Sequence, residues 1–206
     1  GALQGPQCSI ILSSAALGGQ IDRVVTTSGH SGLLKPQLAA LACRVREMQD
    51  PVYKEYAQAV RDNAKALAEG LQRGGAQILS GGTQSHLVIV DCKNSAMSAR
   101  GAQDTLANAG VRVRICDLLT SDPAVRFDAI RFSTLPCTTR GLSCAQMQTL
   151  GECLAGTLLQ PDETHNSTLQ HLVSTLTADL PLFADRWLCA DTREELADFQ
   201  AGYQLS

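Results

Sequence analysis

Apolar residues recur at every third or fourth position along the middle of the chain. Between residues 51 and 73 this stripe consists of Tyr53, Tyr56, Ala57, Val60, Ala64, Leu67 and Leu71. Residues three and four apart share one face of a helix, so the spacing predicts a single long amphipathic helix. Asp50 suits the N-cap and Pro51 the first helical position, and Gly74 with Gly75 provides the stop.

Shorter patterns before and after this helix predict a mixture of helices and strands. Apolar or alternating runs predict strands at residues 7–15, 77–80, 86–91, 111–115 and 129–133. Helical spacing predicts helices at residues 36–48, 98–108, 143–158 and 169–180, the third opened by a capping box of Ser143 and Gln146. Residues 17–36 and 160–167 are rich in small or polar residues and predict loops. The order after residue 50 is typical of a small α+β domain whose sheet is covered by helices.

Composition and charge exclude several classes of protein. The 206 residues are 44% hydrophobic and 18% charged, which suits one large domain or two small ones with a hydrophobic core. The net charge is -3, from 17 basic and 20 acidic residues, so there is no basic excess to bind a nucleic-acid backbone. No apolar run is long enough to predict a transmembrane segment.

The eight cysteines leave two interpretations open. Their even number allows disulfides. However, none forms a C-x-x-C pair and no histidine lies at zinc-ligand spacing, so no metal site is predicted. Several lie inside predicted strands and helices, where a free cysteine behaves as a small buried apolar residue. We therefore favour free thiols and a reducing compartment.

Four stretches, in order and at matching separations, resemble serine hydroxymethyltransferase. They read G-A-L-Q-G-P-Q at 1–7, P-V-Y-K-E-Y at 51–56, G-G-T-Q-S-H-L-V-I-V-D at 81–91 and I-R-F-S-T-L-P-C-T-T-R-G at 130–141. The first resembles the family's K-T-L-x-G-P-R and the last its I-R-x-G-T-P-x-x-T-T-R-G. The third is nearly the family's form, and the third and fourth together make the resemblance specific.

The resemblance implies a fold-type I enzyme that uses pyridoxal phosphate to move the hydroxymethyl group of serine to tetrahydrofolate. The implied fold class is α/β to α+β. Residues 1–50 would be a remnant of the large cofactor-binding domain, 51–75 a linking helix and 76–182 the small C-terminal domain. Residues 183–206 extend beyond the resemblance.

The family's chemistry needs a lysine that bonds to the cofactor aldehyde. Aligned on G-P, that position falls on Gly1, which has no side chain, so no catalytic residue is predicted. The family's phosphate-binding Q-G-G-P loop reads G-H-S-G-L here, and only Gly32 matches it. The family's N-K-N run is replaced by Arg114-Ile115-Cys116.

A few family positions are retained. Arg131 matches the arginine that clamps the substrate carboxylate, a task that suits a planar guanidinium; the alternative is an ion pair within the small domain. His86 matches at the start of a strand, where we favour a packed, hydrogen-bonded histidine over a catalytic one. Thr138, Thr139 and Arg140 match a turn before a helix and are expected to be structural.

The C-terminal extension carries the one tryptophan of the chain. Thr192 and Glu195 fit a capping box for an amphipathic tail. Its candidate docking residues for a partner protein are Trp187, Leu196, Phe199 and Tyr203. Folding back of this tail onto its own domain is the equal alternative.

Three functions follow, in order of preference. The first is a structural or interaction subunit that has lost catalysis, holds no cofactor, and joins a homologous subunit or a large protein complex. The second is an active glycine hydroxymethyltransferase, with pyridoxal phosphate, whose lysine comes from another chain or from preceding sequence. The third is a regulatory module that binds an amino acid or a folate through Arg131. The chain starts with Gly1 rather than Met, which favours a processed mitochondrial protein over a cytoplasmic one.

Overall fold

A computed structural model describes residues 3–27, 34–116, 128–189 and 192–194. The chain divides into two compact units, Gly1–Tyr53 and Lys54–Ser206. We call them the first and second units and describe each by itself. Within the described ranges no helix combines the length and apolar character that crossing a membrane requires.

The first unit contains two helices, α1 (Ala15–Thr27) and α2 (Lys35–Glu47). The predicted helix at 36–48 is confirmed, with a proline in its first turn. The predicted strand at 7–15 is wrong, because residues 8–14 are irregular and α1 begins at Ala15. The predicted loop at 17–36 is also wrong over α1. Leu17, Ile21 and Val24 have helical spacing there, and it outweighs the two glycines that favoured a loop.

The long helix of the sequence pattern is α3, and its bounds are Pro51–Arg73 as predicted. It continues from the end of the first unit into the second, where its apolar stripe is buried. It crosses α6 (Cys144–Leu159) with backbone against backbone. A Cβ atom on Gly151 would lie 2.6 Å from the carbonyl oxygen of Leu67. Only glycine permits this close approach, so the two helices share one dense core.

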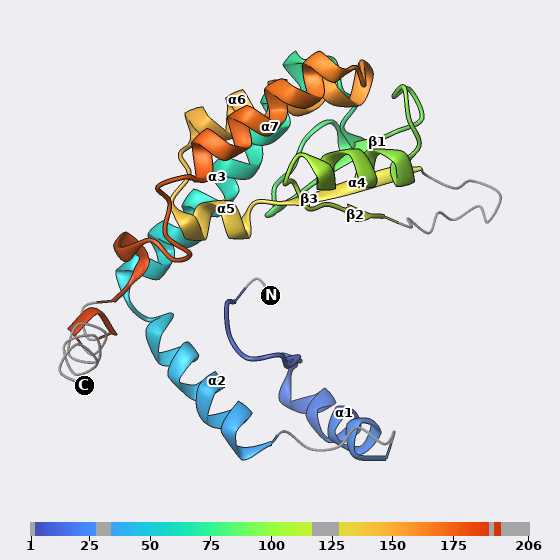
Figure 1. Ribbon diagram of the computed structural model, residues 1–206. Helices are drawn as coiled ribbons and strands as arrows, with labels where there is room; N and C mark the ends of the chain where they lie inside the picture. Colours follow the sequence, from blue (N-terminus) through green and yellow to red (C-terminus); the bar gives the residue numbers. More distant parts are fainter. Residues whose placement is uncertain (1–2, 28–33, 117–127, 190–191, 195–206) are drawn as a thin grey trace. The chain divides into compact units, whose positions relative to one another are not determined.

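The second unit has one sheet in the order β1-β3-β2, and both pairs of strands are antiparallel (Figure 1). The strands are β1 (Leu87–Asp91), β2 (Arg114–Ile115) and β3 (Ala129–Ser133). The strand predicted at 77–80 is wrong: one bridge joins Ile78 to Val90, and the 3-10 turn η1 (Leu79–Gly81) follows. Ser80 and Gly81 have φ angles of 62° and 69°, which end any extended run.

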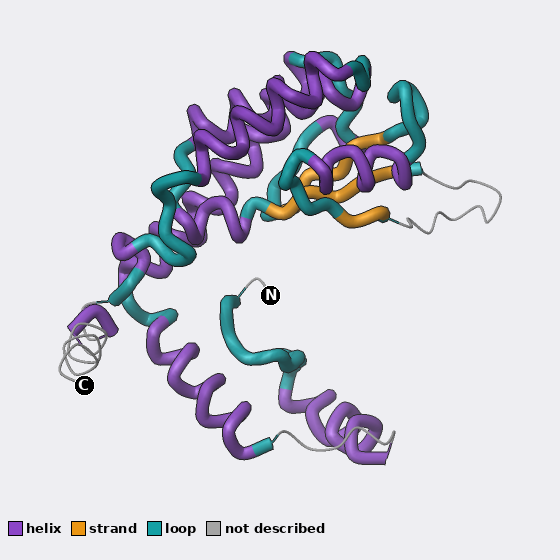
Figure 2. Tube along the Cα trace, viewed as in Figure 1, coloured by secondary structure: helices purple, strands orange, loops and turns teal. Residues whose placement is uncertain are grey.

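Four more helices complete the second unit (Figure 2). They are α4 (Ala99–Asn108), α5 (Leu135–Arg140), α6 and α7 (Glu163–Thr177), followed by the short turn η2 (Asp185–Trp187). The capping box of Ser143 and Gln146 is confirmed. The predicted loop at 160–167 is too long, because Asp162 caps α7 and starts it at Glu163. In Figure 1, α3, α6 and α7 run alongside one another, and the sheet lies beside α4.

Candidate carboxylate-binding site

Strand β3 carries Arg131 at the centre of the sheet. Successive residues of a strand point to opposite faces. Ile130 and Phe132 are buried in the core, so Arg131 lies on the other face, where it is half-buried. In the register of the sheet Arg131 is opposite Ile89 of β1 on one side and Arg114 of β2 on the other. The buried neighbours therefore fix which way the Arg131 side chain points.

The guanidinium of Arg131 has no hydrogen-bond or ion-pair partner within the described ranges. The sequence left open an ion pair that stabilises the small domain, and the described residues contain no such pair. A guanidinium has five N–H donors, and a half-buried one gains most from an acceptor that takes two of them. A carboxylate has that geometry, and the retained position agrees with such a ligand.

His86 lies just before β1 and is half-buried. Burial lowers its pKa, and the nearby positive charge of Arg131 lowers it further. Both effects favour the neutral imidazole, which can donate from one nitrogen and accept at the other. Its backbone carbonyl accepts hydrogen bonds from the backbone N–H of Thr134 at 3.0 Å and from the Thr134 hydroxyl at 3.3 Å. The backbone of His86 thus ties β1 to the end of β3.

A buried polar network fixes the turn that follows β3. The hydroxyl of Thr134 donates to the carbonyl oxygen of Val60 at 3.1 Å. The hydroxyl of Thr138 donates to the carbonyl of Thr134 at 2.9 Å. The amide nitrogen of Asn63 donates to the Thr138 hydroxyl and to the carbonyl of Leu142, each at 2.9 Å. These bonds hold the end of the Arg131 strand against α3.

Thr139 and Arg140 make structural contacts around the same turn. The hydroxyls of Thr139 and Tyr56 lie 3.0 Å apart. The guanidinium of Arg140 donates to the carbonyls of Thr177, Leu180 and Pro181 at 3.0–3.2 Å. These carbonyls lie at and beyond the end of α7, where helix carbonyls lack partners of their own.

Sequence reasoning did not select Asn63, although it lies within the apolar stripe of α3 and is only 2% exposed. A polar residue on a buried helix face needs hydrogen-bond partners, and that requirement was the available signal.

Trp187 folds back onto the second unit, which is the alternative that the sequence left open. Its indole N–H donates to the carbonyl of Thr138 at 2.7 Å. Its ring meets the ring of Tyr56 edge to face, with centroids 5.4 Å apart, and the guanidinium of Arg186 lies 4.4 Å from the Trp187 ring. The other candidate residues Gly1, Gly32, Leu196, Phe199 and Tyr203 lie outside the described residues.

The described residues offer no buried amine for an aldehyde cofactor. Lys35, Lys54, Lys65 and Lys93 are all exposed. A nucleophilic lysine needs desolvation or a neighbouring cation to lose its proton near neutral pH, and an exposed ammonium has no desolvation. Metal chemistry finds no support either, since no group of three metal-ligating side chains occurs in the part of the chain that the structure describes.

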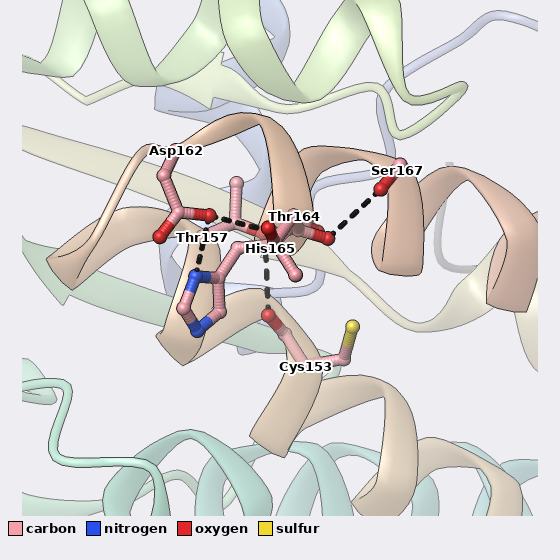
Figure 3. A network of polar contacts seen from close by, with 6 residues as sticks. All are labelled: Cys153, Thr157, Asp162, Thr164, His165 and Ser167. Atoms are coloured by element: carbon pink, nitrogen blue, oxygen red, sulfur yellow. Dashed lines mark hydrogen bonds and ion pairs between the residues drawn. The ribbon is translucent and has the colours of Figure 1, made fainter.

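A second polar cluster surrounds the start of α7 (Figure 3). One carboxylate oxygen of Asp162 accepts from the backbone N–H of His165 at 2.7 Å and lies 2.8 Å from its Nδ1 atom. Cys153 takes part through its carbonyl, which accepts from the Thr157 hydroxyl at 3.3 Å. Burial raises the pKa of the Cys153 thiol, whereas a nucleophilic cysteine needs a lowered one. This cluster is a helix cap.

Comparison with known proteins gives one consistent family. The family model described as serine hydroxymethyltransferase matches residues 10–154. A serine hydroxymethyltransferase of Bordetella avium is 31% identical over 186 residues, which cover 89% of this chain and 44% of that protein. The enzyme of Myxococcus xanthus is 30% identical over 187 residues, with the same coverage. The chain therefore spans less than half the length of the curated relatives it matches.

Proposed function

Because this chain belongs to the serine hydroxymethyltransferase family, we propose that it has lost catalysis and serves as a structural or interaction subunit of a larger protein assembly. The observation that carries the proposal is the apolar surface of the first unit. Two further observations, on the lysines and on the carboxylate position, bear on whether catalysis is retained.

The first unit leaves most of its large apolar side chains in water. Neither α1 nor α2 has a buried residue. The large hydrophobic residues exposed in the described part of this unit are Leu3, Ile10, Ile11, Leu12, Leu17, Val24, Val25, Leu34, Leu38 and Val45. In the described part of the second unit only Ile115, Leu182 and Phe183 are comparably exposed. Concentrated apolar surface of this kind marks sites of protein association.

The lysines support the loss of catalysis. The family resemblance aligns the cofactor lysine with Gly1, and each described lysine is exposed. Pyridoxal phosphate reacts through its aldehyde with a deprotonated amine, and no described residue supplies one in a buried position. The proposed subunit therefore acts through its surface and holds no coenzyme.

Native mass measurement of the purified full chain tests the proposal. Light scattering should show an oligomer, or a complex if the protein is isolated from its source. The double variant Leu12→Ser, Leu38→Ser should shift the mass toward the monomer, because it removes two apolar side chains from the exposed surface of the first unit. Leu182→Ser is the matched control, since Leu182 is 87% exposed in the second unit. A monodisperse monomer of the parent chain would contradict the proposal.

The second candidate is an active glycine hydroxymethyltransferase whose lysine comes from another chain or from sequence outside this one. The partnerless guanidinium of Arg131 favours it, because a retained carboxylate clamp has use in an enzyme. The native complex would then show the visible absorbance of lysine-bound pyridoxal phosphate, and borohydride would abolish it. A native complex without this absorbance would exclude this candidate.

A further inference from the structure

Two arginines lie directly opposite each other on neighbouring strands. The antiparallel register of β2 and β3 pairs Arg114 with Arg131. Side chains in such a pair have Cβ atoms about 4.5–5.5 Å apart, and like charges in this position destabilise the sheet. The packing nevertheless holds them there, because Ile130 and Phe132 are buried and set the register of β3.

Neither arginine has an ion-pair or hydrogen-bond partner in the ranges that the structure describes. Other arginines of the chain do: Arg73 pairs with Glu152, Arg100 with Asp104, and Arg140 binds three carbonyls. Arg131 is half-buried and Arg114 is exposed at the edge strand. The two positive charges thus repel each other with no compensating anion from the described part of the protein.

The residues beside this pair limit what a ligand can be. On the other side of Arg131 the register places Ile89, which is half-buried and apolar. The next row of the same face pairs Leu87 with Ser133. His86, whose charged form is disfavoured by burial and by Arg131, adds a neutral imidazole to the site. The surface therefore combines two cations with an aliphatic floor and a neutral hydrogen-bonding ring.

We infer that the Arg114–Arg131 pair binds a small dicarboxylate, with one carboxylate on each guanidinium and a short aliphatic chain over Ile89. A carboxylate accepts two parallel N–H bonds from one guanidinium, and two carboxylates satisfy both arginines. The linking carbons gain from contact with the apolar floor, whereas a compact inorganic phosphate has no apolar part to place there. This inference does not depend on the proposed role in an assembly, which concerns the first unit.

Titration calorimetry of the full chain with succinate, L-aspartate, acetate, glycine and phosphate tests the inference. Succinate or L-aspartate should bind about 10- to 100-fold more tightly than acetate or glycine, because the second charge-assisted contact contributes on that order. Phosphate should bind no better than acetate. Equal affinity for mono- and dicarboxylates, tighter binding of phosphate, or no binding of any of these acids at millimolar concentration would overturn the inference.

Variants separate the two arginines. Arg114→Gln should reduce succinate binding to the level of acetate and leave acetate unchanged, whereas Arg131→Lys should weaken both. Arg112→Gln is the matched control: it removes the same charge two residues from Arg114, outside the strand register, and it should bind succinate like the parent chain. Thermal unfolding of each variant without ligand verifies folding. An Arg114→Gln chain that folds and binds succinate as well as the parent, or an Arg112→Gln chain that loses as much affinity as Arg114→Gln, would overturn the inference.

Discussion

The two units of this chain contain amphipathic helices with opposite fates. In the first unit α1 and α2 bury no residue. In the second unit α3 and α6 bury most of one face each, and together with the sheet they form one continuous apolar core. An apolar stripe of helical spacing therefore predicts a helix in both units, but it does not say what covers the stripe.

The units also differ in the contacts that hold them together. In the first unit the clearest tertiary contacts belong to Arg44, which pairs with Glu47 at 2.8 Å, donates to the carbonyl of Leu3 and lies 5.0 Å from the ring of Tyr53. Partly exposed polar contacts of this kind contribute little to the free energy of unfolding. The second unit relies on buried apolar area, which contributes far more. The comparison predicts that equal substitutions have unequal effects in the two units.

Shortening a leucine should show the largest difference. Leu154→Ala removes a side chain that is 0% exposed in α6, and it should lower the free energy of unfolding of the second unit by about 2–5 kcal/mol. Leu38→Ala shortens a side chain that is 55% exposed in α2, and it should change that quantity by less than about 0.5 kcal/mol. Urea unfolding followed by the fluorescence of Trp187 measures both, because the single tryptophan packs within the second unit. Equal effects would contradict the comparison.

Adding one methyl group to a glycine should give the next largest difference. Gly151→Ala would place a Cβ atom 2.6 Å from the carbonyl oxygen of Leu67 and 2.8 Å from the backbone nitrogen of Leu71. Separating α3 from α6 should then cost about 1–3 kcal/mol. Gly18→Ala in α1 meets nothing within 4 Å and should raise helix stability by up to about 1 kcal/mol. Thermal unfolding followed by circular dichroism checks both signs, and a stabilising Gly151→Ala would disprove the close crossing.

Helix caps offer a smaller contrast. Ser143 caps α6 reciprocally with Gln146, whereas Leu34 at the start of α2 makes no side-chain cap. Ser143→Ala should therefore destabilise the second unit by about 1 kcal/mol. Leu34→Ser introduces a good cap and should increase the helical circular dichroism of the chain. Loss of helix in the Leu34→Ser chain would show that the Leu34 side chain is itself needed, as an apolar contact.

The sequence predicted elements best where local signals agreed. For α3 the apolar stripe, the proline at its first position and the glycines beyond its end all coincide, and its bounds are correct. For α1 the glycines and threonines favoured a loop, while the stripe of Leu17, Ile21 and Val24 favoured a helix. The two local signals conflicted there, and the weaker-looking one was correct.

The candidate site was predictable only in part, because its chemistry depends on pairing between strands. Motif resemblance selected Arg131 and the threonines of the following turn. It treated Arg114 as a replaced position, since nothing in the order of residues shows that β2 pairs with β3 in the register that brings Arg114 opposite Arg131. The role of Asn63 likewise depends on α5, which lies 75 residues further along the chain. Contacts of this range follow from tertiary packing and are invisible to local periodicity.

Acid should produce the smallest effect and confine it to the second unit. Asp162 caps α7, and hydrogen bonds from the backbone N–H and ring of His165 lower the pKa of its carboxyl group. Because the folded pKa lies below the unfolded one, the stabilisation is complete above the unfolded pKa and is lost as pH falls through the folded value. Neither α1 nor α2 has an acidic residue in its first turn, so neither has an equivalent group.

Hydrogen exchange at the amides of α7 during acid titration measures this loss. Protection at the first turn of α7 should fall below about pH 4, while exchange in α1 follows only the intrinsic pH dependence. Asp162→Asn is the matched control, since asparagine caps a helix about as well as aspartate but does not titrate. If the parent chain and the Asn variant lose protection along the same acid profile, Asp162 is not the titrating cap. The acid sensitivity of the second unit would then have to arise within its core.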